Sequence, residues 1–186
     1  MQRLLIEDGW LVTARKVPSP NYNPRPPQCQ IGLIVIHNIS LPPAQFGGGY
    51  IEQFFQNQLD PSIHPYFAEI KDLQVSAHLL ITRTGEVIQF VSLNDRAWHA
   101  GHSCYQGMDN CNDFSIGIEL EGSDDQPFTE AQYQALVPLL EAIQQNYPAT
   151  CGHVAGHNEI APNRKTDPGA CFDWSRIRPV TTPMNP

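Results

Sequence analysis

Two short segments constrain the fold of this chain more than any other feature. Residues 31–37 are apolar and rich in β-branched side chains on both faces, which is typical of a strand in a sheet covered on two sides. In residues 115–121 apolar side chains alternate with a glycine and two glutamates, the period of a strand with one polar face. Such strands need covering layers. We therefore predict an α/β fold with a mixed central β-sheet flanked by helices.

The other expected elements fit a single domain over residues 1–186. A capping-box pattern beginning at Thr129 precedes an apolar stripe, which predicts an amphipathic helix. Residues 1–30 are expected to form a loop-rich N-terminal arm, because prolines crowd its second half. Periodicity and turn residues further predict a helix over 51–59, strands over 76–82, 87–91 and 151–156, and loops over 18–27 and 158–170.

The charge balance excludes some partners. The chain has 11 lysines and arginines against 19 aspartates and glutamates, a formal net charge of −8. Nucleic acids and anionic membranes both favour basic patches, so neither is expected as the main partner. No apolar run approaches the roughly 18 residues of a membrane helix, and Glu7 and Asp8 interrupt the first apolar residues, so we expect a cytoplasmic protein. The five cysteines form no CxxC pair and are expected to be free thiols.

Two histidines close apolar runs and open polar loops. His37 ends the first predicted strand, and His157 follows the short predicted strand over 151–156. Ligand sites of open α/β sheets gather beyond strand ends, so the two imidazoles can meet in one cleft, with Asp167 ten residues further on. Two histidines and a carboxylate suffice for a catalytic zinc ion. A purely structural histidine pair is the alternative, and His153 is a rival ligand four residues before His157.

Glu119 is the acid best suited to proton transfer. It stands between Ile118 and Leu120, so we expect it to be partly buried, and burial raises a carboxyl pKa toward the range of a general base. Glu121 lies on the same strand face and is the alternative base. The non-catalytic interpretation of Glu119 is a carboxylate held in a salt bridge at the strand end. Lys165 stands two residues from Asp167, within reach of stabilising an oxyanion, unless it is a solvated loop lysine.

An aromatic residue next to polar ones occurs at residues 98–102. Trp98 precedes two histidines and a glycine there, and an indole beside polar groups suits the wall of a sugar- or peptide-binding cleft. A core tryptophan is the simpler interpretation. Residues 47–66, which begin with three glycines and end in an aromatic-rich stretch, are expected to form either a mobile cover over the cleft or an ordinary connection.

Taken together, ordered motifs across nearly the whole chain resemble the zinc-dependent N-acetylmuramoyl-L-alanine amidases, which share the peptidoglycan-recognition fold. The resemblance is strongest to the cytoplasmic branch acting on 1,6-anhydro-N-acetylmuramyl-L-alanine in cell-wall recycling. The motifs are Val35-Ile36-His37-Asn38, Ser76-Ala77-His78, Ala97-Trp98-His99-Ala100-Gly101, Asn112-Asp113-Phe114-Ser115-Ile116-Gly117-Ile118-Glu119-Leu120-Glu121-Gly122, Gly156-His157 and Lys165-Thr166-Asp167-Pro168-Gly169.

The resemblance implies a role for each matching residue. It implies zinc at His37, His157 and Asp167, Glu119 as the base for the attacking water, and Lys165 as the oxyanion stabiliser. It also implies that Trp98 and Asn38 line the substrate groove. Two positions depart from the relatives, which carry arginines where this chain has Gln74 and Asn110.

The implied activity is hydrolysis of the amide between the lactyl group of 1,6-anhydro-N-acetylmuramic acid and L-alanine of the stem peptide. The expected partner is a small soluble muropeptide, and the protein is expected to be a monomer. Two alternatives remain open, an amidase acting on intact peptidoglycan and a zinc-free peptidoglycan-binding module of the same fold.

Overall fold

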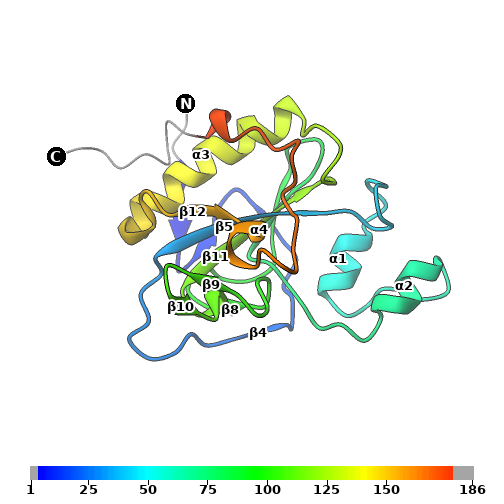
Figure 1. Ribbon diagram of the computed structural model, residues 1–186, viewed down its shortest axis with the longest axis horizontal. Coiled ribbons are helices and arrows are strands. Elements are labelled where there is room, and N and C mark those ends of the chain that lie inside the picture. The colour runs from blue at the N-terminus through cyan, green and yellow to red at the C-terminus, as the bar shows by residue number, and fades with distance from the viewer. Residues whose placement is uncertain (1–3, 178–186) are drawn as a thin grey trace.

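A mixed β-sheet runs through the computed structural model of the chain, which describes residues 4–177 (Figure 1). Within those residues the sheet has six strands in the order β12-β5-β11-β6-β7-β3. The first four are parallel, β7 runs antiparallel to β6, and β3 is parallel to β7. Their bounds are β3 Arg15–Lys16, β5 Leu33–Ile39, β6 Leu79–Ile81, β7 Val87–Gln89, β11 Ser115–Glu121 and β12 Val154–Gly156. The mixed sheet expected from the sequence is confirmed.

Shorter elements surround this sheet. Three two-stranded pairs consist of β1 Ile6–Glu7 with β2 Trp10–Leu11, β4 Tyr22–Asn23 with β8 Arg96–Ala97, and β9 Cys104–Tyr105 with β10 Met108–Asp109. The helices are α1 Tyr50–Phe55, α2 Pro65–Ile70, α3 Glu130–Asn146 and α4 His157–Ile160, with 3-10 turns η1 Cys111–Asp113, η2 Pro148–Thr150 and η3 Trp174–Arg176. None of the helices between residues 4 and 177 has the length and apolarity needed to cross a membrane.

One face of the sheet is covered by α3, which lies along it in Figure 1. The predicted capping box is confirmed, because the Thr129 side chain accepts from the Gln132 amide and the Gln132 side chain accepts from the Thr129 amide. The apolar positions of β11 point to this side. They form one buried cluster with the apolar stripe of α3, and the burial of each such side chain contributes about 1.5–3 kcal/mol.

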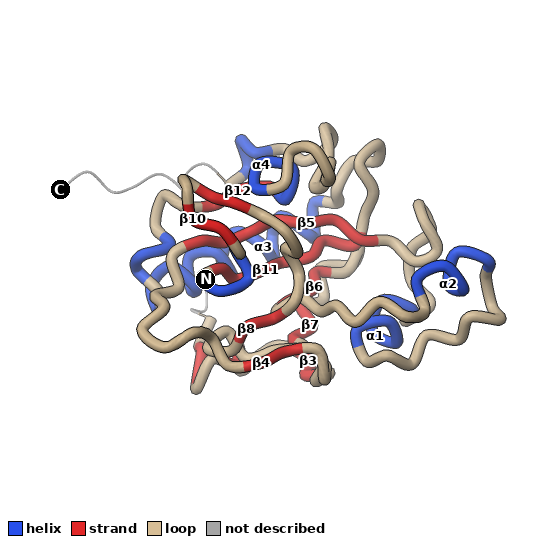
Figure 2. The backbone as a smooth tube through the Cα atoms, turned by 60° about the horizontal axis from the view of Figure 1, so that its bottom comes forward, coloured by secondary structure: helices blue, strands red, loops and turns tan. Residues whose placement is uncertain are grey.

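The opposite face of the sheet carries the polar side chains. Side chains alternate along a strand, so His37 shares its face of β5 with the buried Leu33 and Val35. On β11 the same rule places Ser115 and Glu119 on that face, away from α3. Residues 97–114 and α4 cover this side (Figure 2), and both helices α1 and α2 lie together beyond one end of the sheet.

Several predicted boundaries differ from the structure. Residues 158–160 belong to α4, so the predicted loop over 158–170 was wrong at its start; a four-residue helix is too short to show a period. Within 76–82 only Leu79–Ile81 pairs as a strand, and α1 ends at Phe55 rather than near residue 59. The loop expected over 18–27 contains β4, which exists because it pairs with β8. All five cysteines are free thiols, as expected.

Candidate active site

Three side chains converge near the C-terminal ends of two neighbouring parallel strands. His37 lies on β5, and His157 is the first residue of α4, directly after β12, which pairs with β5. The Nδ1 atoms of the two imidazoles are 2.9 Å apart. Oδ2 of Asp167 lies 3.1 Å from Nδ1 of His37 and 3.0 Å from Nδ1 of His157. These three are the described residues whose ligand atoms form a group able to hold a metal ion.

The loop that carries Asp167 is fixed by backbone contacts at Asp167 and at Gly169. The Asn158 amide donates to the carbonyl of Asp167 at 2.9 Å, which links the loop to α4. Two residues further on, Gly169 has φ +82°, and a Cβ there would overlap the backbone of Asp124. The loop therefore closes tightly, and it holds the carboxylate in one direction.

The protonation of the donor atoms fits a cation. Nε2 of His157 lies 3.0 Å from the Ala100 carbonyl, which only accepts, so Nε2 carries the proton and Nδ1 presents a lone pair. That lone pair faces the carboxylate oxygen of Asp167, an arrangement that needs positive charge between them. The separations of 2.9–3.1 Å are close to the roughly 3.3 Å between ligands of a tetrahedral ion with bonds of about 2.0 Å.

Burial keeps the His37 imidazole neutral, as a metal ligand must be. His37 is 1% exposed and His157 is 3% exposed. Burial is the main reason that the pKa of His37 falls to about 4, and a neighbouring positive His157 would lower it further. A neutral imidazole keeps its lone pair available to a cation at neutral pH.

Glu119 has a free buried carboxylate oxygen beside this group. Its Oε2 has no hydrogen-bond partner among the described residues. Burial, and then the nearby Asp167 carboxylate, raise the pKa of Glu119 well above its usual range, and Lys165 opposes that rise. Within residues 4–177 no salt bridge involves Glu119, so the strand-end ion pair considered for it does not form. An unpaired, buried carboxylate suits proton transfer.

Glu121, the alternative base, is already engaged. Its Oε1 accepts from the Gly47 amide and its Oε2 from the Arg83 amide at 2.9 Å. These bonds tie the end of β11 to two loops. The structure therefore favours Glu119 over Glu121 for proton transfer.

A pocket of about 330 Å³ opens over these residues. Its lining includes five residues singled out in the sequence: His37, His157, Asp167, Glu119 and Lys165. Asn38 also lines it, and its side-chain amide donates to Asp124 and to the Pro168 carbonyl. Phe54 of α1 and Tyr66 of α2 also line it, and both belong to the segment 47–66 that the sequence offered as a possible cover over the cleft.

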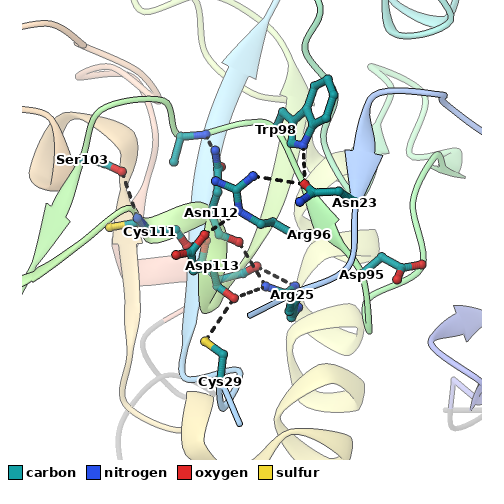
Figure 3. A network of polar contacts seen from close by, with 12 residues as sticks. Asn23, Arg25, Cys29, Asp95, Arg96, Trp98, Ser103, Cys111, Asn112 and Asp113 are labelled. Atoms are coloured by element: carbon teal, nitrogen blue, oxygen red, sulfur yellow. Dashed lines mark hydrogen bonds and ion pairs between the residues drawn. The ribbon is translucent and has the colours of Figure 1, made fainter. Parts of the chain in front are cut away.

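Other candidates lie elsewhere. Trp98 does not line this pocket; its indole nitrogen donates to Oδ1 of Asn23 at 2.7 Å (Figure 3). His153 is also outside, with its Nδ1 3.2 Å from the hydroxyl of Tyr105. Gln74 and Asn110, where the resemblance implied arginines in the relatives, are exposed and likewise do not line it.

Sequence reasoning missed His99, which lines the pocket and lies against His37. Its Nδ1 is 2.9 Å from Nε2 of His37. The only signal in the sequence was its place after Trp98 in the turn at 98–102, because the contact joins residues 62 apart in the chain.

Comparison with known proteins agrees with this geometry. The N-acetylmuramoyl-L-alanine amidase family matches residues 27–170. The 1,6-anhydro-N-acetylmuramyl-L-alanine amidase AmpD of Citrobacter freundii is 54% identical over 98% of this chain and 97% of its own. A crystal structure of an AmpD derivative superposes with a TM-score of 0.93 at 54% identity, covering 96% of this chain and 100% of the other.

A more distant solved structure is the amidase AmiD from Escherichia coli, in complex with the substrate anhydro-N-acetylmuramic acid-L-Ala-D-gamma-Glu-L-Lys. It superposes with a TM-score of 0.62 at 30% identity, covering 99% of this chain and 68% of that one. The ordered motifs, the buried ligand group and these similarities lead to one conclusion. The chain belongs to the N-acetylmuramoyl-L-alanine amidase family.

Proposed function

We propose that this chain hydrolyses the amide between the lactyl group of 1,6-anhydro-N-acetylmuramic acid and the L-alanine of the stem peptide, as a zinc enzyme of cell-wall recycling. The similarity to AmpD proteins over nearly the whole chain supports the substrate class. The observation that supports the chemistry most is the position of the unpartnered Glu119 oxygen in the same pocket as His37, His157 and Asp167.

His37, His157 and Asp167 are the proposed zinc ligands. Two imidazole nitrogens and one carboxylate oxygen form a typical protein ligand set for catalytic zinc, which leaves a further position open. When bound, zinc supplies Lewis-acid chemistry: it polarises a carbonyl and makes water more acidic.

Glu119 is the proposed general acid and base. Its carboxylate takes a proton from the attacking water and then delivers it to the nitrogen of the departing L-alanine amine. The raised pKa of Glu119 favours this double role, since a carboxyl group that is too acidic holds the proton too weakly to transfer it. Lys165, which lines the same pocket, is proposed to stabilise the negative charge that develops on the carbonyl oxygen.

The proposed substrate is a small soluble muropeptide, not the polymer. Asn38 is the residue proposed to contact it beside the ligand group, because it lines the pocket and is held by two hydrogen bonds. Trp98 lies outside this pocket, so any contact that it makes with substrate belongs to a more distant part of the ligand.

The deciding experiment compares substrates on one preparation. Purified protein is incubated with anhydromuropeptide and with intact sacculi, and zinc content is measured alongside. We expect stoichiometric zinc and release of the stem peptide from the soluble substrate. Preferential digestion of sacculi would identify an amidase of intact peptidoglycan, and binding without hydrolysis or zinc would identify a binding module. Either result would overturn the proposal.

A cytoplasmic location and a monomeric state complete the proposal. Fractionation of cells producing the tagged protein tests the location. Light scattering coupled to size-exclusion chromatography tests the monomer, whose expected mass is 20.8 kDa.

A further inference from the structure

We propose that His99 is a positioning residue that holds His37 in the tautomer whose Nδ1 faces the metal ligands. The inference rests on the proposed metal site, and adds to it a residue that touches neither metal nor reacting atoms. It follows from a series of four groups linked by hydrogen bonds: the Cys111 carbonyl, the Ser115 hydroxyl and the imidazoles of His99 and His37. The direction of every bond in the series is set by the group at one end. That end is the carbonyl of Cys111, a group that can only accept.

The direction of each bond follows from the one before it. The Ser115 hydroxyl donates to the Cys111 carbonyl, so its single hydrogen is used there. Nε2 of His99 lies 3.1 Å from the same hydroxyl oxygen, and that nitrogen must therefore be the donor. A neutral imidazole that is protonated on Nε2 has a lone pair on Nδ1. His99 thus presents an acceptor to its other neighbour.

That neighbour is His37. Its Nε2 lies 2.9 Å from Nδ1 of His99, so Nε2 of His37 carries the proton and donates. The lone pair of His37 is left on Nδ1, the atom that lies against His157 and Asp167. The other ligand imidazole is protonated on Nε2 as well, because it donates to the Ala100 carbonyl. Both ligand histidines are therefore oriented by consecutive residues of one turn.

The surroundings of the turn are built to hold it. A Cβ at Gly117 would overlap the ring of His99, so β11 leaves the space that the imidazole needs. Oδ1 of Asn112 accepts from the backbone amides of His99 and Ala100, at 3.0 and 2.8 Å. Figure 3 shows Asn112 within the polar network of η1, where Arg25 donates to the carbonyls of Asn112 and Ser115.

Without the acceptor on His99, the proton of His37 loses its preferred place. The imidazole is then free to carry the proton on Nδ1 or to rotate, and either change removes the lone pair from the metal ligands. Loss of such a partner typically weakens metal binding about 10–100-fold. If the His99 ring only filled space, the zinc affinity would not depend on whether residue 99 offers an acceptor atom.

A matched pair of variants separates the acceptor from the shape. His99→Asn keeps an oxygen near the position of Nδ1, and His99→Leu has nearly the same size with no polar atom. His102→Leu, at an exposed residue of the same turn, is the control. Zinc affinity is measured by competition with a chromophoric chelator, and the tautomer of His37 is read from long-range ¹H–¹⁵N spectra of the protein stripped of metal. Thermal melting of the stripped variants checks folding.

We expect His99→Leu to bind zinc about 10–100-fold more weakly and to mix the His37 tautomers, with His99→Asn close to wild type and His102→Leu unchanged. Equal affinity and one unchanged tautomer in His99→Leu and wild type would overturn the inference, as would equal losses in the Asn and Leu variants. If His99→Leu fails to fold, Ser115→Ala serves in its place. It removes the hydroxyl that accepts from His99, so it should also mix the tautomers of His37. Absence of zinc binding by the wild type would instead refute the proposed metal site, while the tautomer measurement would still test His99.

Discussion

Glu119 and His37 are direct partners across the parallel strands β11 and β5. Both side chains lie on the face away from α3, so the proposed base and a proposed metal ligand share one rung of the sheet. Strand pairing holds such neighbours about 5 Å apart at the backbone. Their relation is therefore set by the hydrogen-bonded register and not by flexible loops, which is the kind of rigid support that a reactive pair needs.

Replacing a proposed ligand should remove the metal. We expect about one zinc ion per chain in the wild type, loss of activity with a chelator, and recovery on adding zinc. His157→Ala should lose zinc outright, because it supplies one of three protein ligands, whereas His153→Ala should keep it. Metal analysis of dialysed proteins checks both. Stoichiometric zinc in His157→Ala would refute the ligand assignment.

Replacing the proposed base should separate binding from chemistry. Glu119→Gln keeps the shape of the side chain and removes its basicity. We expect zinc content and product affinity to survive while single-turnover rates fall by about 10²–10⁴-fold. A near-normal rate in Glu119→Gln would show that another group is the base.

Two companion variants should fail in different ways. Asp167→Asn should bind zinc more weakly, because a neutral amide is a poor substitute for an anionic ligand. Lys165→Ala should keep zinc and lose rate, since its charge acts on an oxyanion that exists only near the transition state. Zinc stoichiometry and single-turnover rates measured on both variants check these expectations, and the reverse pattern would contradict the assigned roles.

The buried His78 should make stability fall in acid. Its Nδ1 accepts from the Gly117 amide, and burial, followed by the charge of Arg25, lowers its pKa to about 3. Below the ordinary pKa of about 6.5 the unfolded chain takes up a proton here that the folded chain does not. The free energy of unfolding should therefore drop as the pH falls from about 6.5 toward 3, by about 2 kcal/mol between pH 7 and pH 5 from this residue.

Urea unfolding of the zinc-stripped protein at several pH values measures this effect. His78→Asn keeps an acceptor for the Gly117 amide but has no proton to gain. The stability advantage of wild type over His78→Asn should shrink as the pH falls. If the stabilities of wild type and His78→Asn changed with pH in parallel, His78 would be protonated to the same extent in the folded and unfolded chains.

The half-buried Arg25 should contribute strongly to folding. The guanidinium of Arg25 donates to four backbone carbonyls, those of Leu93, Asn112, Asp113 and Ser115. Burial lowers its pKa to about 10, and no carboxylate forms a salt bridge with it within residues 4–177. Arg25→Met removes these guanidinium donors from the carbonyls, so we expect a loss of about 2–4 kcal/mol in urea unfolding.

Arg176→Met is the matched control, because Arg176 forms an ion pair with Glu130 at the surface. Such pairs are screened by water, and little change is expected. Similar stabilities for both variants would contradict a structural role for Arg25.

Residues 47–66 should become less mobile when the pocket is filled. Phe54 and Tyr66 from this segment line the pocket, and three consecutive glycines with positive φ precede α1. Hydrogen exchange is measured with and without the product anhydro-N-acetylmuramic acid. We expect slower exchange in residues 47–66 and no change in α3 when product is present. Identical protection with and without product would show that this segment is an ordinary connection and not a cover.

The parts of the fold predicted from sequence are those with local signals. The period of β11 and the capping box of α3 are written in consecutive residues, and both were predicted correctly. The helix α4 was missed, although Glu159 accepts from the Gly156 amide at its start, because four residues show no period. The strand β3 was missed because only its pairing with β7 makes it a strand.

The site divides in the same way. His37, His157 and Asp167 were identifiable because each follows an apolar run or precedes a Pro-Gly turn, and the structure brings them together. The strand expected to end at His37 in fact continues to Ile39, because its last residues still pair with β11. His99 and Trp98 were harder, because what they contact depends on how residues 97–114 fold over the sheet. Trp98 points to Asn23 and His99 points to His37, although they are neighbours in the chain.

The pairing of β12 with β5 sets an order of events during synthesis. The ribosome makes His37 120 residues before His157 and 130 residues before Asp167. The sheet up to β11 and the helix α3 are thus translated while the ligand set is still incomplete. The proposed ion therefore finds its full ligand set only after β12, the last strand between residues 4 and 177, has docked at the edge of the sheet and Asp167 has followed it.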